Sequence, residues 1–326
     1  MKKLISLVLA LILAFSLCCC ALAEGKKDVT VAIAQFAVHG SLDNCREGFL
    51  KGLAAGGYVE GENLTVKYEN AQADMSLAAN IAANFTNNDY DLVCAIATPM
   101  AVCAFNAAED RVPVVYTAVS APVEAGLARE DGLGEGNVTG SSDLLPVSFQ
   151  LEAIRALLPE AKTIGILYTI GETNSQVQLK QYQEAAAEYG FRIVEKGVST
   201  GADIALALPV LLPQVDCLSM LTDNTVVQYL DVVLDESAEA GKPVFGSEVE
   251  QVTLGCVAAV GLDYVQLGYD TGLLAARVLD GENAQEIPYL KISESAVFYN
   301  SEACAEMNIE IPASILEKGQ DMSKAE

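Results

Sequence analysis

The sequence contains few basic residues and only one histidine. Lysine and arginine number 19 against 44 acidic residues, which gives the 326-residue chain a formal net charge of −25. A chain this acidic repels phosphate backbones, so nucleic acid is excluded as an expected partner. The single histidine, His39, cannot form a multi-histidine metal centre. We therefore expect neither a metal nor another cofactor.

Tryptophan is absent, whereas apolar residues are plentiful. The lack of tryptophan argues against a sugar-stacking platform, although a sugar stays open as a ligand on grounds of fold. Hydrophobic residues make up 52% of the chain, which excludes wholesale disorder. One domain usually takes about 100–200 residues, so the length favours two domains.

The first 23 residues have the layout of a secretory signal peptide. Lys2 and Lys3 precede an apolar run over 4–17, and Ala21-Leu22-Ala23 forms a small-x-small cleavage site. The run is too short to span a membrane, which takes about 20 residues. Lipidation at Cys20 is the competing processing route, as in a bacterial lipoprotein. Either route predicts an exported chain, either secreted or periplasmic, or anchored to the cell surface as a lipoprotein.

Six of the nine cysteines follow the predicted cleavage site. An even number outside the cytoplasm allows three disulfides. However, Cys94, Cys217 and Cys256 lie inside apolar runs that have the character of strands. We therefore favour mostly buried free thiols that behave as small hydrophobic side chains.

Apolar strand-like runs alternate with helical patterns along the whole chain. Strands are predicted at 28–34, 63–68, 91–97 and 112–119, with helices at 41–57, 75–87 and 98–109 between them. The pattern then restarts with strands at 162–168, 215–221, 242–245 and 256–260. Such alternation predicts parallel sheets covered on both faces. We therefore expect an α/β fold of two Rossmann-like lobes joined by a hinge.

Polar residues follow the predicted strands in both halves. In open parallel sheets, ligands bind beyond the carboxyl ends of the strands, so two facing lobes place these residues along one cleft. Hydroxyls, amides, carboxylates and a ring suit a small zwitterion, although simple helix capping is an equal alternative for any one of them. The candidate ligand-binding residues are Gln35, Phe36, Thr98, Pro99, Ser120, Ser142, Asp143, Asn174, Ser175, Asp223, Asn224, Glu248 and Asp263. His39 is expected on the surface or at the edge of the cleft.

An ordered series of short strings resembles one family over essentially the whole mature chain. It is similar to the bacterial ABC-transporter substrate-binding proteins grouped with binders of tryptophan and other aromatic amino acids. The strings are VAIAQF at 31–36, EGF at 47–49, GYVEGEN at 57–63, NAQAD at 70–74, ATP at 97–99, NVTG at 137–140, SD at 142–143, NS at 174–175, TDNTV at 222–226, GLDY at 261–264, LG at 267–268 and MNIEIP at 307–312.

The resemblance implies a periplasmic-binding fold of the sugar-receptor type, with three hinge crossings. We expect one lobe over 24–143 plus 263–288 and the other over 144–262 plus 289–326. It further implies that the cleft positions matched in this sequence are Thr98, Ser142, Asp143, Asn174, Ser175, Asp223, Asn224 and Asp263. Ala121-Pro122 and Ser247-Glu248 depart from the family pattern at the cleft rim, so specificity for aromatic amino acids is the less secure implication.

The expected function is that of the extracytoplasmic solute-binding component of an ABC importer. Hinge closure would trap a small ligand, in the first instance an amino acid, and a monomer would deliver it to a permease coupled to an ATPase. A receptor that serves a sensor stays open as an alternative. An enzyme of the two-lobed, cysteine-dependent racemase type is disfavoured, because Cys94, Cys217 and Cys256 lie within predicted strands and not after them, whereas a nucleophile needs exposure and a lowered pKa.

Overall fold

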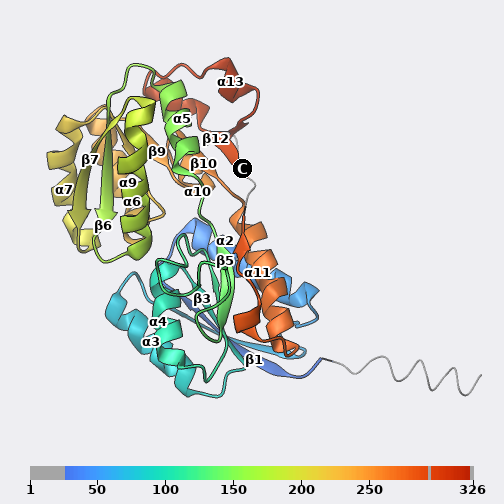
Figure 1. The fold of residues 1–326 in the computed structure, drawn as a ribbon. Coiled ribbons are helices and arrows are strands. Elements are labelled where there is room, and N and C mark those ends of the chain that lie inside the picture. The colour runs from blue at the N-terminus through green and yellow to red at the C-terminus, as the bar shows by residue number, and fades with distance from the viewer. Residues whose placement is uncertain (1–25, 293–294, 324–326) are drawn as a thin grey trace, which may run out of the picture.

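The computed structural model describes residues 26–292 and 295–323, which form two α/β lobes, one above the other in Figure 1. The predicted signal peptide and Cys20 lie outside the described residues. Within the described part of the chain, we find no helix with the length and apolar character needed to cross a membrane.

The first lobe is built on a six-stranded sheet in the order β11-β5-β4-β3-β1-β2, and every pairing within it is parallel. Its elements are β1 (Val29–Gln35), α2 (Gly40–Ala55), β2 (Leu64–Asn70), α3 (Met75–Asn87), β3 (Leu92–Ile96), α4 (Thr98–Ala108), β4 (Val114–Thr117), β5 (Val138–Ser142), α11 (Tyr264–Leu279), η4 (Ala284–Glu286) and β11 (Leu290–Lys291).

The second lobe is built on a seven-stranded sheet in the order β13-β12-β10-β9-β8-β6-β7, in which only the β10–β12 pair is antiparallel among the described strands. Its elements are α5 (Val147–Leu157), β6 (Thr163–Thr169), α6 (Thr173–Ala185), η1 (Ala186–Tyr189), β7 (Arg192–Val198), η2 (Gly201–Asp203), α7 (Ile204–Leu211), η3 (Leu212–Gln214), β8 (Cys217–Ser219), α8 (Asn224–Gln228), α9 (Leu230–Glu239), β9 (Val244–Gly246), α10 (Val249–Thr253), β10 (Ala258–Gly261), β12 (Ala296–Tyr299), α12 (Ser301–Glu306), α13 (Ala313–Leu316) and β13 (Gln320–Asp321).

The chain passes between the lobes three times, after β5, after β10 and after β11. The third crossing differs from the expected boundary at 288. Leu290 of β11 pairs with Ser141 of β5, so the sheet of the first lobe extends to Lys291. A strand of two residues carries too little pattern to be read from sequence, which explains the difference.

The predicted parallel strands are confirmed, most of them to within two residues at each end. β1 and β3 are buried along almost their whole length, as expected for strands with helices on both faces. The expectation of free thiols is also confirmed for the described residues. Their six cysteines are unpaired, and all but Cys103 are buried.

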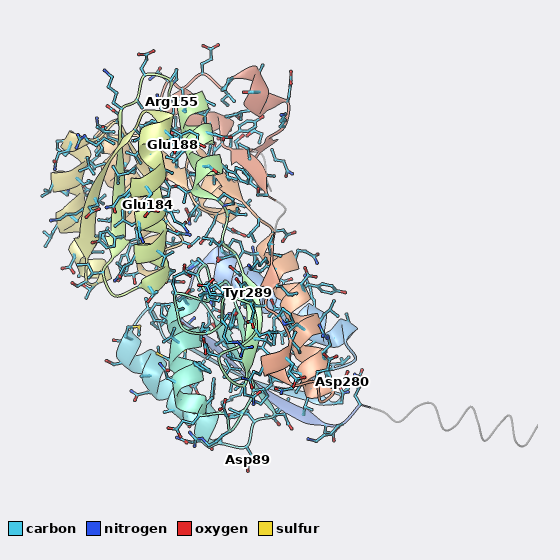
Figure 2. All side chains as sticks on the ribbon, in the orientation of Figure 1. Asp89, Arg155, Glu184, Glu188, Asp280 and Tyr289 are labelled. Carbon is cyan, nitrogen blue, oxygen red and sulfur yellow. The ribbon has the colours of Figure 1, made fainter. Side chains whose placement is uncertain are left out.

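The excess of acidic residues lies over the surfaces of both lobes. Figure 2 shows Glu184 and Glu188 on the second lobe and Asp89 and Asp280 at the far end of the first. Exposed carboxylates of this kind favour solubility and say little about fold.

Helices α2 and α11 cross at very short range in the first lobe. A Cβ added at Gly52 would lie 2.1 Å from the Tyr269 carbonyl oxygen, and one at Gly272 would lie 2.2 Å from the Phe49 carbonyl oxygen. Only glycine therefore fits at these two positions. The contact fixes α11, which returns from the second lobe, against the first lobe.

Replacing Gly272 by alanine tests this contact. We expect Gly272→Ala to lower the free energy of unfolding by about 1–3 kcal/mol, because overpacking outweighs the better helix propensity of alanine. Gly171→Ala is the matched control, since a Cβ there meets nothing within 4 Å. Urea unfolding measures both variants, and equal stabilities would contradict the close contact.

Candidate functional site: the cleft between the lobes

The predicted site residues gather where the two lobes meet. Every predicted site residue except Asp263 is buried. Asp263 is exposed, and its carboxylate accepts a hydrogen bond from the Gln266 N–H at 3.0 Å, which makes it the N-cap of α11. The structure therefore does not group Asp263 with the other predicted residues.

The end of β1 places Gln35 and Phe36 in different roles. The Gln35 amide donates to the Ala37 carbonyl oxygen at 2.7 Å and accepts from Arg46 at 2.8 Å. Gln35 thus holds the loop after β1 in place. Phe36, also buried, lines a cavity between the lobes.

Helix α4 begins at the end of β3, directly at the cleft. Ala97 precedes it with φ of 79°, a left-handed conformation that an alanine adopts only under strain. Thr98 and Pro99 follow as the first helical residues, and no side chain caps this end of the helix. The helix dipole therefore leaves a partly positive helix end at the junction of the lobes.

Glu172 is the central carboxylate of the second lobe, although it is absent from the predicted set. Its Oε1 accepts from the Thr225 N–H at 3.0 Å and the Thr225 hydroxyl at 2.9 Å. Its Oε2 accepts from the Asn224 N–H, the Asn224 Nδ2 and the Asn174 Nδ2 at 3.0, 2.7 and 3.1 Å. Glu172 therefore positions both predicted amides, and the Asn174 Oδ1 remains buried without a hydrogen-bond partner.

Asp223 is fully buried beside Glu172, and its carboxylate also accepts hydrogen bonds from within its own lobe. It accepts from the N–H and the hydroxyl of Thr169 at 2.6 and 2.7 Å, from the Ser175 hydroxyl at 2.7 Å and from the Val226 N–H at 2.8 Å. These contacts connect β6, α6 and α8, and they make Asp223 a positioning residue of the cleft wall.

Burial works against charge on both of these carboxylates. It raises the pKa of Glu172 to about 7, with the nearby Asp223 carboxylate as the second cause. Burial likewise raises the pKa of Asp223. The donors listed above oppose this effect, because hydrogen bonds to a carboxylate stabilise its ionised form. The hydrogen bonds of the two carboxylates connect β6, α6 and α8 into one wall of the cleft, while burial and their mutual repulsion limit the negative charge on that wall.

A third buried carboxylate lies at the first crossing between the lobes. Asp143 accepts a hydrogen bond from the Tyr264 hydroxyl at 3.0 Å through its Oδ2, while its Oδ1 has no partner. Burial raises the pKa of Asp143. The Ser142 hydroxyl donates to the Ser120 carbonyl oxygen at 3.2 Å, and the Ser120 hydroxyl meets Thr222 of the other lobe at 2.8 Å.

A cavity of about 320 Å³ lies between the lobes and has walls from both of them. The first lobe contributes Phe36 and residues 72–75, and the second contributes residues 169, 171–172, 199–202, 225 and 228–229. This volume lies at the lower end of the range of small-molecule sites, about 300–1,000 Å³. The cavity therefore fits a ligand of amino-acid size.

The lobes also touch on the side of α2. The hydroxyl of Ser41 and the amide of Asn44 contact Glu248 and Glu250 of the second lobe. The side chain of His39 is only 8% exposed and lies against Glu248 of the other lobe, so of the two expected positions the surface is wrong and the edge of the cleft agrees with the structure. Among these residues, sequence reasoning gave Glu248 alone as a site residue.

The cysteines do not favour racemase chemistry. Burial raises the pKa of the Cys94 and Cys256 thiols, and it raises that of Cys217 to about 12. These thiols stay protonated at neutral pH and are buried in the described structure, whereas a nucleophile must be ionised and accessible.

Comparison with known proteins identifies the family. The model of the ABC transporter substrate binding proteins matches residues 30–322. The chain belongs to this family. It is 35% identical to a tyrosine-binding protein of Clostridioides difficile over 322 residues, which covers 95% of this chain and 93% of the relative.

Two solved structures show the arrangement of the lobes. A Streptococcus pneumoniae domain in complex with L-Trp is 32% identical, with a TM-score of 0.87 over 90% of this chain and 98% of that chain. A ligand-free, open substrate binding protein of Clostridium difficile is 36% identical but has a TM-score of only 0.66, over 87% of this chain and 96% of that chain. The two sequence identities are similar, so the difference in TM-score shows that the lobes of this chain are arranged more like those of the L-Trp complex than like those of the ligand-free, open protein.

Two capping aspartates provide a test of the cleft wall. We expect Asp223→Ala to lower the free energy of unfolding by about 2–4 kcal/mol, because it leaves buried donors unpaired while relieving repulsion with Glu172. Asp263→Ala removes an exposed cap and should cost about 1 kcal/mol. Urea unfolding of the two variants measures the difference, and equal losses would contradict the positioning role of Asp223.

Proposed function

We propose that this chain is the extracytoplasmic solute-binding component of an ABC importer and that its ligand is an aromatic amino acid. The observation that carries the proposal is the cavity of about 320 Å³ between the lobes, which has Phe36 in its wall. The relatives that bind tyrosine and L-Trp support the choice of ligand.

The cleft offers a partner for each part of a zwitterion. The uncapped N-terminus of α4 suits the ligand carboxylate, since a helix N-terminus presents free N–H groups and a partly positive charge. Asp143 and Asn174 lie outside the lining of this cavity. If the ligand reaches them, their unpaired Oδ1 atoms suit the ammonium group, which carries only donors. Phe36 suits the aromatic side chain.

The energies are consistent with closure around the ligand. Burying one aromatic ring removes about 150–250 Å² from water, which is worth about 4–6 kcal/mol before costs. Micromolar binding requires about 8 kcal/mol. Charge-assisted hydrogen bonds of about 1.5–3 kcal/mol each supply the remainder and offset the lost freedom of the ligand. Only closed lobes provide both contributions at once.

The proposed mechanism is a hinge motion at the three crossings. The ligand stabilises the closed form, and the closed form of a monomer docks on a permease coupled to a cytoplasmic ATPase. Export by the predicted signal peptide, or anchoring at Cys20, would place the chain where it meets its ligand. A sensor that reads the closed form instead of a permease would use the same cleft.

Substitution of Phe36 tests whether its ring contacts the side chain of the ligand. We expect Phe36→Leu, which keeps most of the packing, to weaken binding of L-tryptophan and L-tyrosine by about tenfold, because the ring contact is lost. Phe149→Leu is the control, since Phe149 is 42% exposed on the second lobe. Isothermal titration calorimetry measures the affinities, and equal affinities in both variants would remove Phe36 from the site.

A thermal-shift screen against amino acids, nucleosides and simple sugars tests the ligand class. A ligand that binds only the folded chain raises the melting temperature by mass action. We expect increases with tryptophan, tyrosine or phenylalanine. Stabilisation by sugars or nucleosides alone would contradict the proposed ligand.

A further inference from the structure

The start of α2 in the first lobe faces the start of α10 in the second, as Figure 1 shows. The Ser41 hydroxyl lies within hydrogen-bond distance of Glu248 Oε2 and, at 2.8 Å, of Glu250 Oε2. The Asn44 amide donates to Glu250 Oε1 at 2.6 Å. We call these four residues, Ser41, Asn44, Glu248 and Glu250, the clasp.

If both carboxylates of the clasp are ionised, one of the two oxygen–oxygen contacts at Ser41 has no hydrogen to bridge it. A serine hydroxyl carries a single hydrogen and can donate to one carboxylate oxygen only. The second carboxylate oxygen beside Ser41 then repels the hydroxyl oxygen, unless it carries a proton and donates to that oxygen. Ser41 is fully buried and Glu248 is 3% exposed, so water is excluded from the short contact. The geometry therefore favours a protonated carboxyl group in the clasp.

The groups around Glu248 do not neutralise it by charge. Asp143 faces it from the first crossing, Tyr264 from α11 and Cys256 from the segment before β10, and each of these groups would add negative charge if it were ionised. Among the described residues, the one basic side chain within ion-pair distance is that of His39, whose Nδ1 lies 3.8 Å from Glu248 Oε2. Both nitrogens of His39 are buried without a hydrogen-bond partner. Burial disfavours its charged form and outweighs the opposing effects of the neighbouring Asn224 and of the Asp43 carboxylate.

Burial shifts the pKa values of Glu248 and His39 in opposite directions. It raises the pKa of Glu248 to about 8 and lowers the pKa of His39 to about 4. Both side chains lie at a contact that exists only while the lobes touch. Opening exposes them to water and returns them toward their ordinary pKa values of 4.5 and 6.5.

We propose that the clasp is a proton-coupled lock, in which Glu248 binds a proton as the lobes close, so that the ligand is held less tightly as the pH rises above neutrality. This inference rests on the proposed function, because closure matters only if it traps a solute. In the clasp, Ser41 and Glu248 act as positioning residues and do not contact the ligand.

The two titrations define the expected pH profile. Between about pH 5 and 6.5, closure adds a proton to Glu248 and removes one from His39, so the affinity changes by no more than about twofold. Above about pH 7.5 His39 is largely neutral in both forms, and within the clasp only the proton on Glu248 is still required. We expect the affinity for the amino acid to fall about tenfold between pH 6.5 and 8.5.

Calorimetric titration of the full chain with L-tryptophan and L-tyrosine tests the lock. At pH 7.5, titrations in buffers of different ionisation enthalpy should show a net uptake of protons as the ligand binds. This measurement needs no variant. An uptake of zero, or an affinity that is constant from pH 6.5 to 8.5, would overturn the clasp while leaving the proposed function intact.

Glu248→Gln separates the lock from a structural role. The amide is neutral and needs no proton to be buried, so the variant should lose the fall in affinity and bind more tightly than the wild type at pH 8.5. Asn44→Ala is the matched control, because it weakens the same contact without removing a titrating group and should keep the fall. The buried pair Glu172 and Asp223 is unchanged in both variants, so its own titration does not affect the comparison.

Two further outcomes decide the assignment of residues. His39→Gln should bind about tenfold more tightly at pH 5.5 than at pH 6.5, because the opposing titration is gone. If Glu248→Gln instead weakens binding at every pH, Glu248 holds the ligand directly and the clasp is wrong. If no amino acid binds the wild type at any pH, the proposed function fails and the inference with it.

Discussion

The rest of the structure depends on how the carboxylates that are buried between the two lobes find partners. Each must find hydrogen-bond donors or a positive charge, since burial without them is costly. Glu172 and Asp223 find donors within the second lobe, from the starts of α6 and α8 and from the end of β6. Asp143 and Glu248 accept fewer hydrogen bonds than Glu172 and Asp223 do. Closure must therefore bring protons or an ammonium group with it.

This condition links the proposed ligand to the motion of the lobes. An amino acid carries an ammonium group for the unpaired oxygens of Asp143 and Asn174 and a carboxylate for the uncapped start of α4. The walls themselves stay rigid, because the close contact of α2 with α11 fixes the returning helix to the first lobe. In the proposed mechanism, movement is therefore concentrated in the three crossings.

Much of this architecture could be predicted from periodicity alone. The predicted strand at 91–97 corresponds to β3 and the predicted helix at 75–87 to α3, since buried parallel strands and amphipathic helices have distinct patterns. The structure buries the polar residues that follow the strands, with Asp263 as the exception, and their contact with a ligand stays a prediction. Asp223 and Asp263 are both caps that follow strands, and only tertiary burial distinguishes them.

The contacts between the lobes could not be predicted in this way. Ser41 and Glu250 are separated by 209 positions, and no local pattern pairs them. Glu172 gives little signal because a lone glutamate before a helix is common at a surface. The extension of the first lobe by β11 depends on two residues whose pairing is set by the neighbouring strand.

The central claim is that the two lobes close around an amino acid. Small-angle X-ray scattering of the chain with and without L-tryptophan or L-tyrosine tests it most directly. We predict a larger radius of gyration without ligand, and with ligand a scattering profile that matches the structure described above. A profile unchanged by an amino acid that demonstrably binds would contradict closure and, with it, the account of the cleft.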